Sequence, residues 1–335
     1  MRAALYSRTG PAADVLSIVD RDRPEPGAGE VRVRVAWSGV NPSDTKSRAG
    51  SRSPIMPFPE VIPHSDGAGI VDAVGEGVDG LRRGDRVWLW NAAWGRPFGT
   101  AAEWIVVPAR QAVLLPDNVA LDVGACLGIP ALTACHAVSM DGGVAGRRVL
   151  VAGGAGSVGH YAVQMARLCG AREIFATVSS EEKAALAKSA GADHVLNYRS
   201  EDLAQRLLEL TGGQGVDRII EVDIAANAKA DFEMLAANGE IVAYGSGRPD
   251  VIVPFVPGIL KNIRLSFFIV YHLGDADRVR AIGQLTQWLR ADLLSHRIAA
   301  RFELDAIADA HEQVESGRAI GNVVVSPWAH ATRPS

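Results

Sequence analysis

Residues 149–159 read Val-Leu-Val-Ala-Gly-Gly-Ala-Gly-Ser-Val-Gly, an apolar run that leads into closely spaced glycines. The apolar run is typical of a buried strand, and residues 157–169 are typical of a helix. Gly153, Gly156 and Gly159 stand three residues apart, which allows a tight turn, close approach to a pyrophosphate, and close packing of helix on sheet. Glycine triplets also occur in ordinary turns. Because a strand and a helix flank this one, it predicts a dinucleotide site.

Beyond Pro116 the pattern alternates between strand and helix. Such alternation predicts an α/β fold, with a doubly wound parallel six-stranded sheet covered by helices on both faces. The expected strands are residues 148–152, 174–178, 194–197, 218–222, 240–244 and 263–271, and the expected helices are residues 121–138, 158–169, 181–189, 201–211 and 225–237.

The first 120 residues are instead rich in strand-like runs separated by proline and glycine turns. Their irregular spacing predicts a twisted, barrel-like unit rather than a parallel sheet. The expected strands of this unit are residues 1–6, 31–37, 69–74, 85–90 and 102–107.

The chain from residue 274 onward does not extend the parallel sheet in an obvious way. A helix is expected at 276–290, followed by a strand, a helix and a last strand at 322–325. We infer that the chain returns to the β-rich unit, whose domain is then discontinuous. The expected domains are residues 1–122 with 260–335, and residues 123–259; the tail at 329–335 is expected to be frayed.

Composition excludes several classes of protein. A length of 335 residues suggests two domains, and a net charge of −4 without basic runs argues against nucleic acid or anionic membrane as the main partner. Residues 1–6 lack the apolar core of a signal peptide, and the most apolar stretch, 265–273, is too short to cross a bilayer. Cys126, Cys135 and Cys169 all stand in apolar contexts, which favours buried free thiols and a cytoplasmic protein.

Seven short motifs, in this order and spacing, resemble the medium-chain dehydrogenase/reductase superfamily. Within it, the chain is similar to the zinc-free NADPH:quinone oxidoreductase branch that includes zeta-crystallin. The resemblance extends from the N-terminus to about Val325. Its motifs are Val-Asn-Pro-Ser-Asp-Thr at 40–45, Gly-Ala-Gly-Ile-Val at 67–71, Gly-Asp-Arg-Val at 84–87, Gly-Ile-Pro-Ala-Leu-Thr-Ala at 128–134, Leu-Asn-Tyr-Arg at 196–199, Gly-Glu-Ile-Val at 239–242 and Gly-Ser at 245–246.

The resemblance implies a chaperonin-10-like catalytic domain beside a Rossmann cofactor domain, with hydride passing from NADPH to a quinone or related conjugated carbonyl. It also implies a homodimer that pairs the sixth Rossmann strands, which fits the apolar run 265–271 because an unpaired apolar edge is a liability. The cofactor residues carried over from the family are Asn41, Thr133, Gly153, Gly156, Ser157, Val158, Gly159, Ser179, Lys183, Tyr198, Gly245, Ser246 and Arg318.

The family's zinc ligands are replaced in this chain. Zinc members carry cysteine where Asn41 stands and a histidine–glutamate pair where Ser65 and Asp66 stand. Catalytic zinc needs three protein ligands, and asparagine and serine are poor substitutes. His64 is one residue out of register with the family histidine. It could ligate zinc together with Asp66, but no cysteine is near it in the sequence, so we expect a hydrogen-bonding residue and no metal.

The end of the second Rossmann strand favours NADP over NAD. Binding of the ribose 2′-OH of NAD usually uses an acidic residue there, whereas residues 176–180 read Ala-Thr-Val-Ser-Ser. By resemblance, Lys183 and Tyr198, with an arginine near Arg318, would hold the 2′-phosphate. The neighbouring Glu181 and Glu182 oppose this assignment, and Lys183 and Tyr198 have ordinary structural alternatives.

In the catalytic domain, the resemblance implies that Asn41 faces nicotinamide and substrate, and Ser65 offers a hydroxyl nearby. Without zinc, these groups would stabilise the negative charge that develops on the acceptor oxygen. The alternative for Asn41 is a local turn before Pro42. Asp44 is expected to cap a helix or turn rather than act as a base.

The residues of the acceptor pocket and the reaction itself each have more than one interpretation. Lys46 and Arg52 stand where some bacterial quinone reductases carry tyrosine, and Trp90, Trp94 and Phe98 either line an acceptor pocket or pack as a lid. A 2-alkenal or enoyl reductase shares every motif, and it would need a proton donor such as Lys46 or Tyr271. The alternative outside the enzymes is a non-catalytic scaffold protein that binds NADPH.

Overall fold

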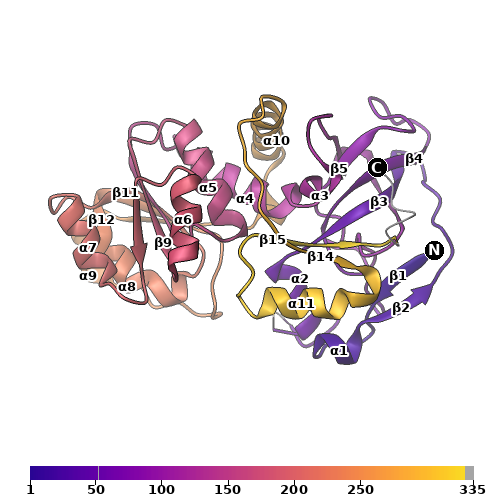
Figure 1. Ribbon diagram of the computed structural model, residues 1–335, viewed down its shortest axis with the longest axis horizontal. Coiled ribbons are helices and arrows are strands. Elements are labelled where there is room, and N and C mark those ends of the chain that lie inside the picture. The colour runs from indigo at the N-terminus through magenta and orange to yellow at the C-terminus, as the bar shows by residue number, and fades with distance from the viewer. Residues whose placement is uncertain (52, 329–335) are drawn as a thin grey trace. The chain divides into compact units, whose positions relative to one another are not determined.

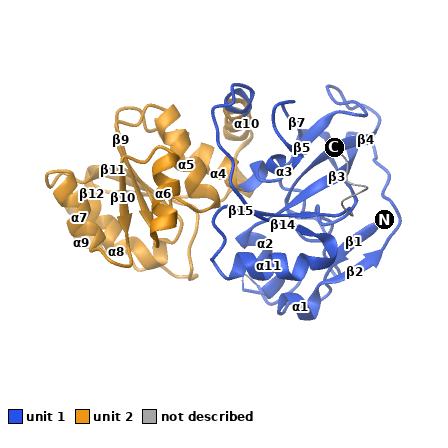
Figure 2. Ribbon diagram, viewed as in Figure 1, with its two compact units in different colours: residues 1–129, 286–335 blue, residues 130–285 orange. Residues whose placement is uncertain are grey.

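A computed structural model describes residues 1–51 and 53–328 of the chain. It divides into two compact units, shown in different colours in Figure 2. Unit 1 comprises Met1–Ile129 together with the chain from Thr286 onward, and unit 2 comprises Pro130–Leu285. Each unit has its own sheet.

Unit 2 is built on a six-stranded sheet in which every neighbouring pair of strands is parallel. The strand order β10-β9-β8-β11-β12-β13 places the first strand, β8, near the middle, as expected for a doubly wound sheet. The prediction of a parallel six-stranded sheet is confirmed. The strands are β8 (Arg148–Val151), β9 (Glu173–Val178), β10 (His194–Asn197), β11 (Val216–Glu221), β12 (Leu235–Ala243) and β13 (Arg264–Phe267).

Helices cover both faces of this sheet (Figure 1). Helices α5 and α6 lie on one face with α4, and α7, α8 and α9 lie on the other. Leu150, Phe175 and Ile219 are fully buried in the core between sheet and helices. The helices are α4 (Leu132–Ser139), α5 (Ser157–Leu168), α6 (Glu181–Ser189), α7 (Leu203–Leu210), α8 (Ile224–Met234), α9 (Phe255–Leu260) and α10 (Asp275–Arg290), which runs across the boundary into unit 1.

Unit 1 contains a seven-stranded, largely antiparallel sheet and a separate hairpin. The path of the large sheet is β14-β15-β3-β4-β5-β7, and β6 pairs with β3 off this path. Since β14 and β15 come from the end of the chain, the inferred return to the first unit is confirmed. The strands are β1 (Arg2–Leu5), β2 (Ser17–Asp20), β3 (Glu30–Val40), β4 (Asp66–Val74), β5 (Arg86–Leu89), β6 (Trp104–Pro108), β7 (Ala112–Leu114), β14 (Ile298–Glu303) and β15 (Asn322–Ser326).

Short helices complete unit 1. Helix α11 contributes to an apolar core with β1 and β15 through residues such as Ile307 and Val325. Helix α2 directly follows β3, so the residue between them, Asn41, is the N-cap of α2. The helices are α1 (Ala12–Val15), α2 (Pro42–Ala49), α3 (Leu121–Gly124) and α11 (Ile307–Glu315).

Three predicted boundaries are corrected. The sixth strand ends at Phe267 rather than 271, and a 3-10 turn, η3 (Val270–His272), follows. The helix expected at 121–138 is divided into α3, a π-helical turn η2 (Leu127–Ala131) and α4, because Pro130 lacks an amide hydrogen. Because β13 pairs with β12, the segment 260–285 lies in unit 2 and not with the β-rich unit.

Among the described residues, no helix is long and apolar enough to span a membrane. The three cysteines are free thiols, as expected; Cys126 and Cys135 are buried, and Cys169 is half-buried. Burial raises the pKa of all three thiols, which makes them poor nucleophiles. The predicted frayed tail at 329–335 lies outside the described residues.

Candidate functional site

The glycine-rich loop between β8 and α5 has the geometry expected from its spacing. Gly153 has a φ of +68°, and its amide donates to Thr177 Oγ1 at 3.0 Å. Gly156 is the N-cap of α5. A Cβ atom on Gly159 would collide with the carbonyl oxygen of Gly153, so only glycine lets the helix pack this closely. Ser157 and Val158 form the first turn of α5, whose amides can receive an anion.

The residues predicted to hold a 2′-phosphate lie at the neighbouring strand ends. Ser179 directly follows β9, and the Lys183 Nζ donates to its Oγ at 3.0 Å. Lys183 is in the first turn of α6, where its amide donates to the N-cap Ser180 Oγ at 3.3 Å. Tyr198 follows β10, is half exposed, and donates its amide to the Val178 carbonyl at 3.1 Å. Serine, lysine and tyrosine are therefore placed at two adjacent strand ends.

The acidic residues and the arginine considered for the 2′-phosphate site lie as follows. Glu181 and Glu182 are exposed on α6, and Ser180, not a carboxylate, caps that helix. Arg318 belongs to unit 1, where it is exposed in the turn after α11.

A cavity of about 750 Å³ lies at the carboxyl ends of β12 and β13. Its lining includes Gly245 and Ser246, both predicted cofactor residues, and Phe268. His136 lies edge-on to the Phe268 ring, with 4.8 Å between ring centroids. Thr133 is buried one turn earlier on α4 and does not line this cavity. In a doubly wound sheet, ligands bind at the carboxyl ends of the strands.

In unit 1, Asn41 is held in a reciprocal capping box at the start of α2. Its side chain faces the backbone N–H of Asp44, and the Asp44 carboxylate accepts a hydrogen bond from the backbone N–H of Asn41 at 2.8 Å. Asp44 therefore caps a helix, as predicted, and the local role considered for Asn41 is also present. Ser65 is buried immediately before β4.

Asp66 is a buried part of this site for which the sequence motifs predict no role beyond its match to a zinc-ligand position of the family. Its Oδ2 accepts hydrogen bonds from Asn41 Nδ2 at 2.9 Å and from the Ile129 amide at 3.0 Å. Burial, reinforced by the charge of Asp44, raises the pKa of the Asp66 carboxyl well above its usual range. This contact gives Gly128 and Ile129 of the motif at 128–134 a structural role beside Asp66.

His64 is used inside the unit 1 core. Its Nδ1 pairs with Ser38 Oγ at 2.7 Å, and its Nε2 pairs with His311 Nε2 at 2.9 Å. Burial and His311 lower the pKa of His64 well below the ordinary value. Across residues 1–51 and 53–328, no group of three or more His, Cys, Asp or Glu side chains is arranged to hold a metal.

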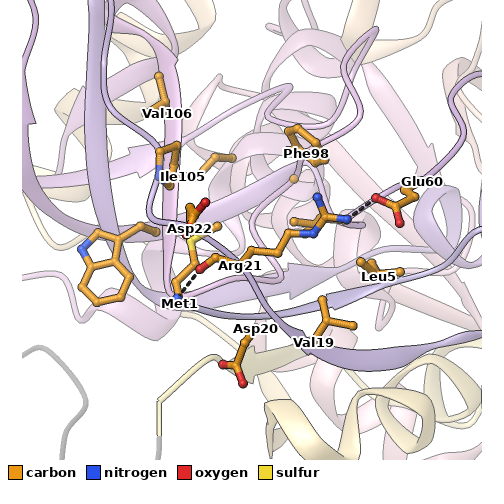
Figure 3. Close-up of a pocket in the computed structure, with 14 residues that line it drawn as sticks. Met1, Leu5, Val19, Asp20, Arg21, Asp22, Glu60, Phe98, Ile105 and Val106 are labelled. Atoms are coloured by element: carbon orange, nitrogen blue, oxygen red, sulfur yellow. Dashed lines mark hydrogen bonds and ion pairs between the residues drawn. The ribbon is translucent and has the colours of Figure 1, made fainter.

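The aromatic residues do not share one cavity. Phe98 lines a cavity of about 740 Å³ within unit 1, where the Arg21 guanidinium lies 5.6 Å from its ring centroid and pairs with Glu60 (Figure 3). Trp90 is buried and Trp94 is 37% exposed, and neither lines that cavity. Lys46 is exposed on α2, Tyr271 is buried on η3, and Arg52 lies outside the described residues.

Comparison with known proteins gives two family matches. Residues 157–287 match the zinc-binding dehydrogenase family, and residues 27–117 match the alcohol dehydrogenase GroES-like domain. A quinone oxidoreductase of Lama guanicoe is 31% identical over 97% of both chains. A 2-haloacrylate reductase of a Burkholderia species is 30% identical over 98% of this chain and 99% of its own.

Solved structures agree with these relatives. An NAD-dependent alcohol dehydrogenase has a TM-score of 0.89 at 29% identity, covering 98% of this chain and 100% of its own. Escherichia coli quinone oxidoreductase complexed with NADPH has a TM-score of 0.87 at 26% identity, with the same coverage. The chain is an oxidoreductase of the medium-chain dehydrogenase/reductase superfamily. Within that superfamily it belongs to the quinone oxidoreductase branch.

Proposed function

We propose that this protein transfers hydride from NADPH to a quinone or a related conjugated carbonyl compound without a metal ion. The observation that carries the proposal is the anion site of unit 2, where the glycine loop, the N-terminus of α5 and the Ser179–Lys183 pair lie at neighbouring strand ends. Bound NADPH supplies the hydride from its nicotinamide ring.

The cofactor choice follows from charge. A 2′-phosphate is favoured by the Lys183 ammonium and by hydroxyl donors on Ser179 and Tyr198, and a carboxylate at the end of β9 would repel it. Arg318 would add a second cation. Since the structural relatives include an NAD-dependent enzyme as well as an NADPH complex, it is these residues that favour NADPH.

The cavity beside Gly245 and Ser246 is the proposed place for the nicotinamide half of the cofactor, with Thr133 on the neighbouring helix. Its volume of about 750 Å³ suits a group of that size. In unit 1, Asn41 is the proposed donor to the acceptor or nicotinamide carbonyl. Ser65, which directly precedes Asp66 in the sequence, is proposed to offer a hydroxyl group. Quinone reduction gives a delocalised anion that water can protonate, so no strong acid is required.

Metal-free chemistry is proposed from the chemistry of the side chains. Asn41, Ser65 and Asp66 offer oxygen and amide groups, and His64 uses both ring nitrogens in other hydrogen bonds. Three nitrogen, sulfur or carboxylate ligands and an open position are the usual requirement of catalytic zinc.

A second candidate is reduction of a carbon–carbon double bond, favoured by the 2-haloacrylate reductase relative. That reaction adds hydride at one carbon and a proton at the other, so it needs a proton donor. Lys46 is exposed and Tyr271 is buried, and either residue would be tested as that donor.

We also propose a homodimer through the β13 edge of unit 2. Strand β13 is the last in the sheet order, and Phe267 on it is 64% exposed. Exposed apolar side chains continue over the preceding segment: Ile252, Phe255, Val256, Ile259 and Leu260. Exposed apolar side chains that precede an open strand edge in the sequence favour pairing with a second copy.

The test is to follow NADPH absorbance with 1,2-naphthoquinone, a benzoquinone and a 2-alkenal in turn, with inductively coupled plasma mass spectrometry of the purified enzyme. Quinone-dependent oxidation without stoichiometric zinc supports the proposal. Oxidation with the alkenal alone favours the second candidate. Tight binding of NADPH without its oxidation by any acceptor would contradict the proposal and favour a non-catalytic scaffold protein.

A further inference from the structure

The amide group of Asn41 is fixed on two sides. Its oxygen faces the Asp44 N–H in the capping box, and its Nδ2 donates to Asp66 Oδ2 at 2.9 Å. The side-chain NH2 has two hydrogens, and one is used by Asp66. Nδ2 therefore keeps one N–H that can be donated to a ligand, and the oxygen keeps only its second lone pair.

The Asp66 carboxyl is itself held tightly. Oδ2 accepts hydrogen bonds from Asn41 Nδ2 and from the Ile129 backbone amide. Oδ1 is buried and has no hydrogen-bond partner among the described residues. A Cβ atom on Gly128 would overlap both Asp66 Oδ1 and the Leu89 carbonyl oxygen, so the carboxyl fills the space above this glycine. A buried oxygen without a donor favours the neutral acid, with the proton on Oδ1.

We propose that Asp66 is a positioning residue: a neutral carboxylic acid that sets the Asn41 amide so that its remaining N–H is presented to a ligand carbonyl. This inference rests on the proposed function, because it assigns Asn41 the role of donor in hydride transfer.

The neutral state of Asp66 has a chemical consequence. Negative charge develops on the acceptor oxygen as hydride arrives, and donors placed in advance stabilise it. An ionised carboxylate hydrogen-bonded to the same amide would oppose that charge, while a neutral acid keeps the geometry without the repulsion. Asparagine at position 66 would reproduce a neutral acid closely, because its carbonyl oxygen can accept both hydrogen bonds.

The kinetic test compares Asp66→Asn with Asp66→Ala, alone and combined with Asn41→Ala. We expect Asp66→Asn to keep kcat within about threefold and Asp66→Ala to lower kcat by about 10²-fold, with little change in KM for NADPH. In the Asn41→Ala background, Asp66→Ala should cost less than about twofold, because the group through which it acts is gone. An equal loss in both backgrounds, or equal losses in the two Asp66 variants, overturns the proposal.

A spectroscopic test does not depend on turnover. The carboxyl carbon of Asp66, assigned by comparison with Asp66→Asn in protein carrying carbon-13 aspartate, should show the neutral form at pH 7. The Asn41 side-chain amide signals should be retained in Asp66→Asn and shifted in Asp66→Ala. An ionised Asp66 at pH 7 refutes the inference even if the quinone reductase activity is present. A neutral Asp66 in a protein that reduces no quinone would leave the positioning intact and reject the proposed function instead.

Discussion

Lys183 Nζ donates to Ser179 Oγ across 3.0 Å, and this pair joins the start of α6 to the end of β9. The hydroxyl holds the ammonium group at the strand end, where an acidic residue of NAD-specific sites would stand. Lys183 is half-buried, so its charge is less screened than that of a fully exposed lysine.

Lys183→Ala should selectively weaken the use of NADPH. We expect kcat/KM of the wild type to be at least about tenfold higher with NADPH than with NADH, and the substitution to remove most of that preference by losing a charge-assisted contact worth about 1.5–3 kcal/mol. Steady-state kinetics with both coenzymes is the measurement. Lys188→Ala, at an exposed lysine on the same helix, is the control. Equal wild-type values for the two coenzymes would refute the 2′-phosphate assignment.

Asn41→Ala should lower kcat by about 10²-fold with much less effect on KM for NADPH, because a donor to the developing charge acts in the transition state. Asn41→Asp keeps the shape but removes the donor, so it should show a similar loss. Stopped-flow measurement of a single turnover separates hydride transfer from product release. Unchanged turnover in both variants would remove Asn41 from the chemistry.

The sequence predicted the geometry of the glycine-rich loop well because its requirement is local. Gly153 and Gly159 are needed by a turn of seven residues, and φ and packing both follow from the missing side chain. The contact between Asn41 and Asp66 was not predicted. It joins residues 25 positions apart, and it depends on the antiparallel register that places Gly39 opposite Asp66.

Apolar patterns also misplaced some boundaries. The run 263–271 is mostly apolar, yet strand pairing stops at Phe267 because the partner strand β12 ends at Ala243. Hydrophobicity marks burial, and the length of a strand depends on its neighbour. The helix expected at 121–138 is interrupted around Pro130, and the apolar periodicity does not take account of proline.

A buried carboxyl pair should make the stability of unit 2 depend on pH. Glu221 and Asp231 are both fully buried, and burial, with the charge of Glu221, raises the pKa of Asp231 to about 9. The native state keeps a proton that the unfolded chain releases near pH 4, so the free energy of unfolding should fall as pH rises toward 9. The slope is at most about 1.4 kcal/mol per pH unit.

Urea unfolding between pH 5 and 9 measures this dependence. Asp231→Asn should flatten the profile, because the amide has no proton to lose, and Asp309→Asn, at an exposed carboxylate, should leave it unchanged. A profile for Asp231→Asn that falls as steeply as the wild type would contradict the retention of a proton by native Asp231.

Phe267→Lys should convert the proposed dimer into monomers. A charge on an exposed strand edge opposes pairing of two such edges. Val279→Lys, which replaces a 71% exposed apolar residue on α10, is the control. Light scattering on a size-exclusion column reports the mass of each variant. A wild type that is monomeric at micromolar concentration would reject the interface.

Gly128→Ala should damage both stability and activity, because the added methyl group would overlap Asp66 Oδ1 and the Leu89 backbone. Overpacking of this kind costs about 1–3 kcal/mol, and displacement of the Asp66 carboxyl would also release the Asn41 amide. Gly283→Ala is a matched control: it lies in α10 with no atom within 4 Å of the added methyl, and it should raise stability by about 0.4–1 kcal/mol. Thermal unfolding and kcat, measured for both variants, check the prediction. If Gly128→Ala keeps the wild-type kcat and melting temperature, the space above residue 128 is not the constraint that holds Asp66 against Asn41.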